Sequence, residues 1–161
     1  MPISFVRIDD RIIHGQIVTK WSKFKKCNGI LVIGDDIAAD EFRCKVLKAA
    51  APSNVKVGIY TINEGLEKIE KAKNAQNSYF VISNSPLTFQ KLVELGADFG
   101  SELNVGPMSA RENAKTLGRN LAITLEEKNA FDVINNRGIK VYFQLTPDDS
   151  SQDWKSLKEK Y

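Results

Sequence analysis

The chain has 161 residues, of which 42% are hydrophobic and 27% are charged, and its formal net charge is +3. This length and balance are typical of an ordinary soluble globular protein, and we expect one domain that spans residues 1–161. The sequence excludes a membrane span, because no apolar run reaches the length that a bilayer needs, and its N-terminus lacks the pattern of a signal peptide.

The charged and sulfur-containing residues argue against nucleic-acid binding and against a disulfide or metal pair. Lysines are spread along the chain and aromatic residues do not alternate with them, so we expect no nucleic acid among the partners. Cys27 and Cys44 lie far apart, without a CxxC motif or a second histidine. They are expected to be small, at least partly buried side chains rather than a disulfide or a metal pair.

The first half of the chain alternates predicted strands and helices. Residues 3–8 form an apolar run that predicts a strand, and Ile17, Val18, Trp21 and Phe24 then recur at helical spacing, which predicts a core-facing helix. The next expected elements are a buried strand at 29–34, a helix from about 36 to 51 that ends before Pro52, a strand at 55–60, and a helix to about 73 that Thr61 and Glu64 cap.

The second half continues the alternation. The expected elements are a strand at 78–83, a helix from Ser85 and Pro86 to Gly96, a strand at 102–105, a polar loop at 106–113, a short strand at 121–123, a helix capped by Thr124 and Glu127 that ends near 136–138, a strand at 139–145 and a short helix at 153–160. Repeated strand–helix units predict an α/β fold: a three-layer αβα open sheet, mainly parallel, with about six to seven strands.

The most informative stretch is residues 7–16, Arg-Ile-Asp-Asp-Arg-Ile-Ile-His-Gly-Gln, where the first predicted strand gives way to a helix. Its His14 is the only histidine of the chain. A helix N-terminus presents unpaired N–H groups and a partial positive charge that suit a phosphate. An imidazole there can act as a nucleophile, and Arg11 offers a forked donor set that matches phosphate oxygens. The stretch predicts a histidine that accepts a phosphoryl group, with a merely structural or exposed histidine as the alternative.

The neighbours of His14 have supporting roles in this hypothesis. Asp9 and Asp10 would hold Arg11 or fix the orientation of the imidazole, and their residue types do not decide between these roles; capping and turning are the ordinary alternative. Gly15 would let the helix start approach the phosphate closely. Gln16 would brace the loop or contact a partner.

The loops after other predicted strands are expected to meet His14 at one rim, because ligands of open α/β sheets bind beyond the carboxyl ends of the strands. These loops are residues 34–36, 84–86 and 106–109. Ser85 and Ser109 would then offer hydroxyl and backbone N–H groups to the phosphoryl group. Capping and turning are again the alternative for both serines.

Residues 7–16 resemble, residue for residue, the phosphorylation-site segment of the IIB components of the mannose/fructose/sorbose family of the sugar phosphotransferase system (PTS). The resemblance covers nearly the whole chain, including residues 34–36, 51–55 and 104–106. It implies that a IIA component phosphorylates His14, on Nδ1 in this family, and that His14 passes the group to a sugar that enters through the membrane components IIC and IID. Family members serve mannose, fructose, sorbose and amino sugars, so the resemblance does not specify the sugar.

The resemblance also implies a cytoplasmic subunit that associates peripherally with the membrane through IIC and IID. Because the first predicted strand starts directly after Met1, we expect a separate IIB subunit rather than a fusion with IIA. The transfer needs no cofactor and no metal in this domain, and a shallow, convex site would let His14 meet two partners. A homodimer is left open.

Two alternatives to a phosphohistidine carrier remain. A receiver-like domain, phosphorylated on aspartate with Mg²⁺, would use the acidic pairs Asp9-Asp10 and Asp35-Asp36 at strand ends as hard-cation ligands. Against it, residues 60–62 at the end of the third predicted strand contain no acceptor aspartate. A non-catalytic regulatory or scaffold module is the second alternative, and the presence of His14, Arg11 and Gly15 argues against it.

Overall fold

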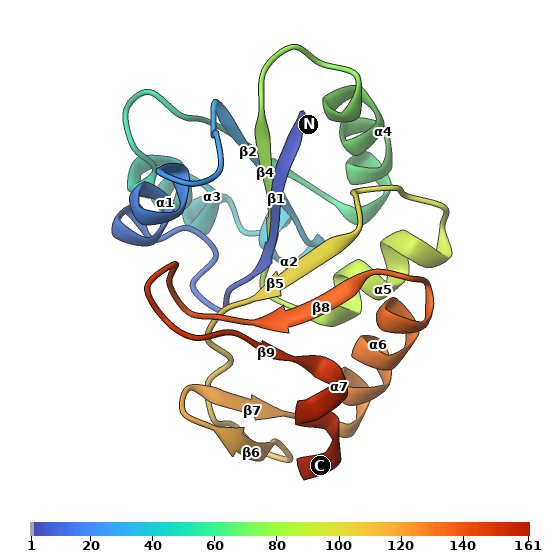
Figure 1. Ribbon diagram of the computed structural model, residues 1–161. Coiled ribbons are helices and arrows are strands. Elements are labelled where there is room, and N and C mark those ends of the chain that lie inside the picture. The colour runs from blue at the N-terminus through green and yellow to red at the C-terminus, as the bar shows by residue number, and fades with distance from the viewer. Residues whose placement is uncertain (1) are drawn as a thin grey trace.

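The computed structural model describes residues 2–161, which form a main sheet of seven strands with helices on both faces (Figure 1). The strands of this sheet are β1 Ile3–Ile8, β2 Gly29–Ile33, β3 Lys56–Tyr60, β4 Tyr79–Ser83, β5 Glu102–Val105, β8 Lys140–Phe143 and β9 Gln152–Asp153. Their order is β3-β2-β4-β1-β5-β8-β9, and all neighbours are parallel except β9, which runs antiparallel to β8. The predicted three-layer, mainly parallel fold is confirmed.

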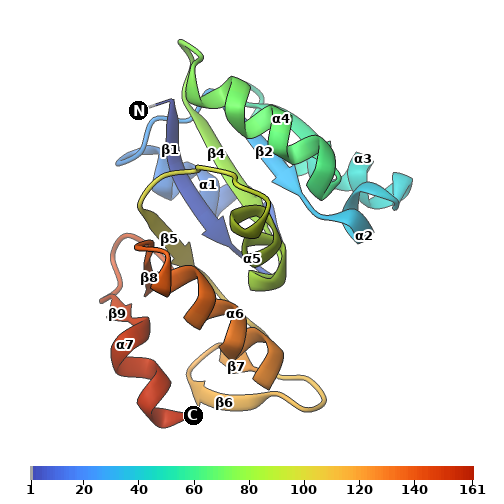
Figure 2. The same cartoon turned by 90° about the vertical axis from the view of Figure 1, so that its right-hand side faces the viewer.

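Helices cover the two faces of the sheet in two groups. They are α1 Gly15–Ser22, α2 Asp35–Ala38, α3 Glu41–Ala50, α4 Ile62–Lys73, α5 Pro86–Glu94, α6 Leu125–Asn136 and α7 Trp154–Leu157, followed by a 3-10 turn at Lys158–Lys160. Figure 2 shows α4, α5 and α6 in front of the sheet and α1 behind it. Trp21 and Leu47 belong to the core on the α1–α3 face, whereas Phe89, Phe131 and Trp154 belong to the core on the other face.

Local capping signals place several helix starts where the sequence predicts them. Thr61 and Thr124 each begin a helix with a reciprocal capping box, which satisfies two otherwise unpaired backbone donors. Ser85 caps α5, and Pro86 occupies its first turn. These predictions are confirmed. They could be made from the sequence because each cap depends on residues within one turn of the chain.

The predicted helix at 36–51 is wrong in one respect, because it is two helices. Asp40 separates α2 from α3, and its carboxylate accepts a hydrogen bond from the backbone N of Arg43 at 3.0 Å. This side chain starts a new helix instead of lying inside a longer one. The predicted core position of Phe24 is also wrong, since α1 ends at Ser22 and Phe24 is 68% exposed.

Two strands of the structure, β6 and β9, were not predicted from the sequence. Strand β6, Lys115–Gly118, pairs antiparallel with β7, Leu121–Ile123, in a separate two-stranded sheet. Three of the four residues of β6 are exposed, so the strand lacks an apolar pattern. Strand β9 has two exposed residues and is defined only by its pairing with β8.

The two cysteines are free and partly buried, as predicted. Burial raises the pKa of Cys27 to about 11. Its thiol is therefore protonated near neutral pH, and only a thiolate is an effective nucleophile or metal ligand.

The connections of the sheet reverse direction between β1 and β4, which are neighbours. Strand β1 leads into α1 on one face, whereas β4 leads into α5 on the opposite face. Such a reversal opens a crevice beyond the carboxyl ends of the two strands, where open α/β sheets bind ligands. His14 follows the carboxyl end of β1 and precedes α1.

Candidate functional site

A tight, strained turn joins β1 to the site. The backbone N of Ile12 donates to the carbonyl of Asp9 at 2.9 Å, and Ile12 has a φ of 65°. A β-branched residue adopts this left-handed conformation at a cost of about 1–3 kcal/mol. Ile12 and Ile13 are both buried in the core beneath α1, which holds the turn in place. The turn leaves Arg11 exposed and places His14 at the N-cap of α1.

Asp9 is a buried carboxylate that organises two arginines. Its Oδ2 lies 3.1 Å from Nη2 of Arg7, and its Oδ1 accepts from the backbone N of Arg11 at 2.9 Å. The side-chain Nε of Arg11 lies 3.9 Å from the same Oδ1. No hydrogen bond among residues 2–161 joins Asp9 to His14. The Asp9 carboxylate therefore contacts the two arginines and does not bond to the imidazole within the described residues.

Arg7 is a buried residue of the site that the sequence prediction missed. It is 2% exposed, and every N–H of its guanidinium has an acceptor. The acceptors are the Asp9 carboxylate, the Asn104 side chain and the carbonyls of Gln144 and Leu145. Burial lowers the pKa of Arg7, and the neighbouring Asp9 carboxylate opposes that shift. Arg7 thereby ties the turn after β1 to the ends of β5 and β8.

Asp10 connects the same turn to the loop after β5. Its Oδ2 accepts from the backbone N of Ser109 at 3.0 Å and also from the Ser109 hydroxyl. The backbone N of Asp10 donates to the carbonyl of Pro107 at 3.2 Å. Both groups that Ser109 was expected to offer to a phosphoryl group, its hydroxyl and its backbone N–H, donate to Asp10 in this structure.

The Nδ1 atom of the His14 ring is buried and has no hydrogen-bond partner among residues 2–161. If transfer uses Nδ1, as the resemblance implies, the ring would have to turn before that nitrogen could meet a partner. Turning breaks no hydrogen bond of the ring within the described residues. His14 itself is partly exposed, as its predicted contact with partners requires.

Two predicted residues of the helix start have different surroundings. A Cβ on Gly15 would lie 3.0 Å from the carbonyl O of Ala50, so the close approach that needs glycine is to the end of α3. Gln16 is exposed on the first turn of α1. Packing against α3 thus favours glycine at position 15, whereas the sequence prediction gave only the approach to a phosphate as the reason.

In two of the expected rim loops, the polar side chains bond to the starts of helices. The Ser85 hydroxyl accepts from the backbone N of Leu87 at 3.1 Å and so caps α5. In the loop after β2, Asp35 accepts from the backbone N of Ile62 at the start of α4, at 2.8 Å. Strand β4 separates β2 from β1 in the sheet order, which explains why this second loop lies away from His14.

A cleft of about 600 Å³ opens beside Arg11. Its walls come from the turn after β1, from α1, from the loop after β5, from the turn between β6 and β7 and from the loop between β8 and β9. Arg7 and Ile17 line both this cleft and the small cavity beside His14. The cleft and the histidine therefore share a wall.

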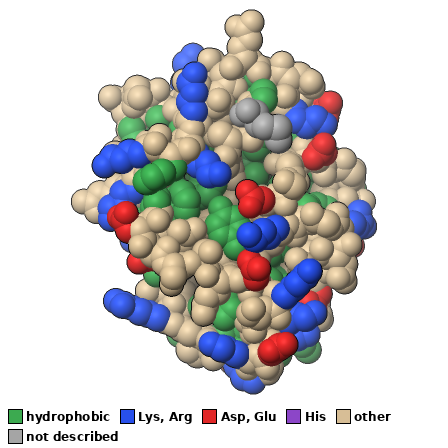
Figure 3. Space-filling model, viewed as in Figure 1, with side chains coloured by type: hydrophobic (Ala, Val, Ile, Leu, Met, Phe, Trp, Pro, Cys, Tyr) green, Lys and Arg blue, Asp and Glu red, His purple; other side chains and the backbone are tan. Residues whose placement is uncertain are grey.

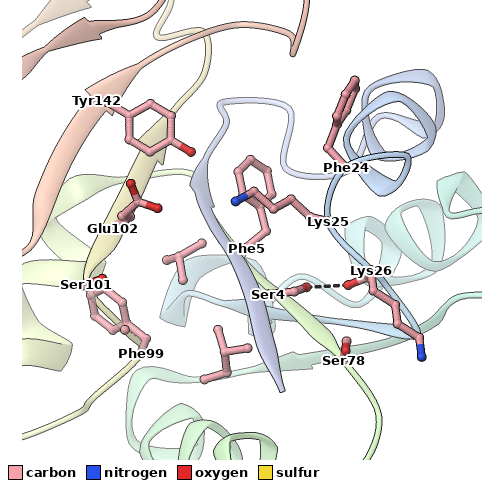
Figure 4. A pocket seen from close by; sticks show the side chains of 13 residues that line it. Ser4, Phe5, Phe24, Lys25, Lys26, Ser78, Phe99, Ser101, Glu102 and Tyr142 are labelled. Atoms are coloured by element: carbon pink, nitrogen blue, oxygen red, sulfur yellow. Dashed lines mark hydrogen bonds between the residues drawn. The ribbon is translucent and has the colours of Figure 1, made fainter. Parts of the chain in front are cut away.

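A second hollow lies at the opposite strand ends (Figure 4). It measures about 460 Å³ and includes Ser4, Phe5, Phe24 and Tyr142. Figure 4 shows these side chains around the start of β1, where the Ser4 hydroxyl donates to the carbonyl of Lys26. His14 follows the other end of β1, so this hollow does not belong to the site.

Figure 3 shows lysine and arginine side chains scattered over the face seen in Figure 1, with hydrophobic side chains near its centre. Within residues 2–161 no helix is both long and apolar enough to cross a membrane, and no three metal-ligating side chains cluster together.

Comparisons with known proteins agree on one family. A family model described as the sorbose subfamily IIB component of the PTS matches residues 3–161. The fructose-specific EIIB component of Bacillus subtilis is 30% identical, with 96% of this chain and 94% of that protein covered. The mannose-specific EIIAB component of Escherichia coli is 34% identical over 88% of this chain and 43% of its own length. The crystal structure of the IIBSor domain of the sorbose permease from Klebsiella pneumoniae superposes with a TM-score of 0.90 at 28% identity, covering 99% of this chain and 98% of that one.

Proposed function

The chain belongs to the sorbose subfamily of PTS IIB components, and we propose that it carries the phosphoryl group of that system on His14. The IIB components of this class are sugar phosphotransferases, and this chain shares that activity. The observation that supports His14 as the carrier is its place. It is the only histidine of the chain, and it lies between the carboxyl end of β1 and the start of α1, with the exposed Arg11 nearby.

Two transfers follow from this assignment. A phosphohistidine of the IIA component donates first: a nitrogen lone pair of His14 forms the new N–P bond as the donor's N–P bond breaks. A sugar hydroxyl then attacks phosphorus, the electron pair of the N–P bond returns to the ring, and the hydroxyl proton passes to water. Positioning and charge stabilisation supply most of the catalysis in such transfers. The chain needs no further reacting group for either step.

The partners and the sugar follow from the same proposal. The IIA component donates the phosphoryl group, and the membrane components IIC and IID present the sugar, so the chain works on the cytoplasmic side of the membrane. Relatives are named for fructose, sorbose, mannose and N-acetylgalactosamine. The substrate is a sugar of this class. One domain, residues 1–161, suffices for the carrier step.

The relay is tested by reconstitution. Phosphoenolpyruvate with labelled phosphate, the general phosphotransferase proteins, a cognate IIA and this chain are combined with vesicles that contain IIC and IID. The label is expected on this chain first and on a sugar of the class afterwards. Label that reaches the sugar at the same rate without this chain would contradict the carrier role.

Arg11→Ala is expected to slow the phosphorylation of His14 and to shorten the lifetime of the phosphoprotein. The Arg11 side chain is 52% exposed and free to contact a phosphoryl group. Hydrogen bonds to charged groups contribute about 1.5–3 kcal/mol, which corresponds to a change of roughly 10- to 100-fold in rate. The rate and the half-life are measured with labelled phosphate, and Arg11→Lys, which keeps the charge, is expected to lie between. Unchanged kinetics in Arg11→Ala would reduce this residue to a brace of the loop.

A further inference from the structure

Two buried nitrogen atoms beside one small cavity lack hydrogen-bond partners. They are Nδ1 of His14 and Nε1 of Trp21, and neither is bonded to any group among residues 2–161. Both side chains line the small cavity beside His14. A buried polar group without a partner is unfavourable, so each such group needs an explanation. The pair offers one donor, the indole N–H, and one acceptor, the lone pair of a neutral imidazole.

The indole of Trp21 is held firmly beside this cavity. Trp21 lies seven residues after His14, so the two side chains share one side of α1. The indole is 4% exposed and stacks on Phe5, with the ring centroids 4.5 Å apart. Cζ of Arg7 lies 5.8 Å from the centroid of the same indole. Because Phe5 and Arg7 are buried residues of β1, these contacts keep the indole in place while the His14 ring turns.

The cavity is large enough for one water molecule. The space open to the centre of a water there is about 10 Å³, which is about what a single buried water needs. A water in it would accept from the Trp21 indole N–H and donate to Nδ1 of a His14 ring that carries its proton on Nε2. We propose that Trp21 is a positioning residue that holds the unphosphorylated His14 ring through this water. The inference rests on the proposed carrier function.

Phosphorylation of Nδ1, the nitrogen that the resemblance implies, would end this contact. The lone pair of Nδ1 forms the new N–P bond as the N–P bond of the IIA phosphohistidine breaks, and each ring keeps the proton on its other nitrogen. Nδ1 then accepts no hydrogen bond, and a space that fits one water does not fit a phosphoryl group. The ring therefore turns away from Trp21 when it is phosphorylated.

A contact that exists in only one of two states stabilises that state. The bond from Trp21 through the water thus favours the unphosphorylated chain, and it makes the phosphorylated chain a better donor to the next acceptor. One hydrogen bond corresponds to roughly 2- to 12-fold in an equilibrium constant. Trp21 would therefore adjust the direction of transfer without touching the phosphoryl group.

Trp21→Phe tests the inference, because phenylalanine keeps an aromatic ring beside Phe5 and lacks the N–H. The chain and IIA are brought to equilibrium with labelled phosphate, and the label on each protein is measured. Trp21→Phe is expected to shift the ratio toward this chain by roughly 2- to 12-fold. Trp154→Phe is the matched control, since Trp154 is also buried but its Nε1 donates to Oδ1 of Asp132 at 2.8 Å, on the other face of the sheet. This control should give the wild-type ratio.

A second measurement needs no variant. The chain has two tryptophans, so its NMR spectrum contains two indole N–H signals. In the unphosphorylated chain we expect a cross-peak between the Trp21 N–H and a bound water. Phosphorylation of His14 should remove this cross-peak and should leave the Trp154 signal unchanged.

Equal ratios for the wild type and Trp21→Phe would overturn the inference, as would a shift of the same size in Trp154→Phe. A water cross-peak of Trp21 that is never seen, or that persists in the phosphorylated chain, overturns it even if Trp21→Phe does not fold. In each of these cases His14 is still phosphorylated, and the carrier function stands. A wild-type chain that is never phosphorylated on His14 overturns the carrier function itself, and this inference with it.

Discussion

His14→Ala is expected to abolish phosphorylation of the chain by IIA, because the substitution removes the proposed acceptor nitrogen and no other histidine can replace it. The fold should survive. The ring makes no hydrogen bond within residues 2–161, and the first helical bond of α1 uses the backbone carbonyl of His14, which alanine retains. We expect the free energy of unfolding to change by less than about 1 kcal/mol.

Labelled phosphate incorporation and urea unfolding measure the two effects in the same samples. Thr19→Ala is a matched control on the same helix, since its side chain is exposed and its hydroxyl makes no hydrogen bond among residues 2–161. Incorporation into His14→Ala at the rate of Thr19→Ala would contradict the assignment. A cooperative unfolding transition in both variants would show that loss of incorporation is not loss of fold.

Arg7→Ala is expected to destabilise the protein by about 3–5 kcal/mol, because it leaves the Asp9 carboxylate buried without its partner. The side chains of Arg7 and Asp9 are 3% and 2% exposed, and Arg7 also bonds to the ends of β5 and β8. This loss is a large part of the 5–15 kcal/mol that is typical of a folded domain. Urea unfolding with an unchanged m-value would measure it directly.

The chain offers a close control for this prediction. Arg11→Ala removes an arginine that faces the same carboxylate, but this side chain is 52% exposed and its Nε lies 3.9 Å from Oδ1. Exposed ion pairs contribute about 0–1 kcal/mol, so Arg11→Ala should be nearly as stable as the wild type. Replacing Asp9 by Asn in the Arg7→Ala background should recover part of the loss. Equal stability of Arg7→Ala and Arg11→Ala would contradict the structural role of the buried pair.

The elements that the sequence predicts well are those that local signals define. The capping boxes at Thr61 and Thr124 and the Ser85-Pro86 start satisfy backbone donors within one turn, so no distant contact is needed to recognise them. The sequence predicts that strand β2 is buried, because its residues are apolar on both faces. The parallel sheet follows from the alternation of such strands with helices.

The parts that the sequence does not predict depend on distant partners. Arg7 stands in an apolar run, and its guanidinium donates to the Asn104 side chain and the Gln144 carbonyl, which are 97 and 137 positions away. One local signal was present, because Asp9 follows two residues later and residues two apart on a strand share a face. The cleft beside Arg11 needs five separate segments to meet, and no local pattern predicts that.

Two findings contradict the receiver-like alternative: the family to which the chain belongs, and the arrangement of the acidic residues. The family model assigns the chain to the IIB components. The two acidic pairs follow β1 and β2, which β4 separates in the sheet, and Asp9 and Asp35 are already engaged with Arg7 and with the start of α4. These pairs therefore do not converge on a common cation among residues 2–161.

The most direct test is to phosphorylate the wild-type chain with phosphoenolpyruvate, the general phosphotransferase proteins and a cognate IIA, and then to map the modified residue. An acid-labile phosphate on His14, formed without added metal, is the expected result. An acid-stable phosphate on an aspartate, formed with Mg²⁺ and acetyl phosphate when several IIA proteins fail to label His14, would contradict it.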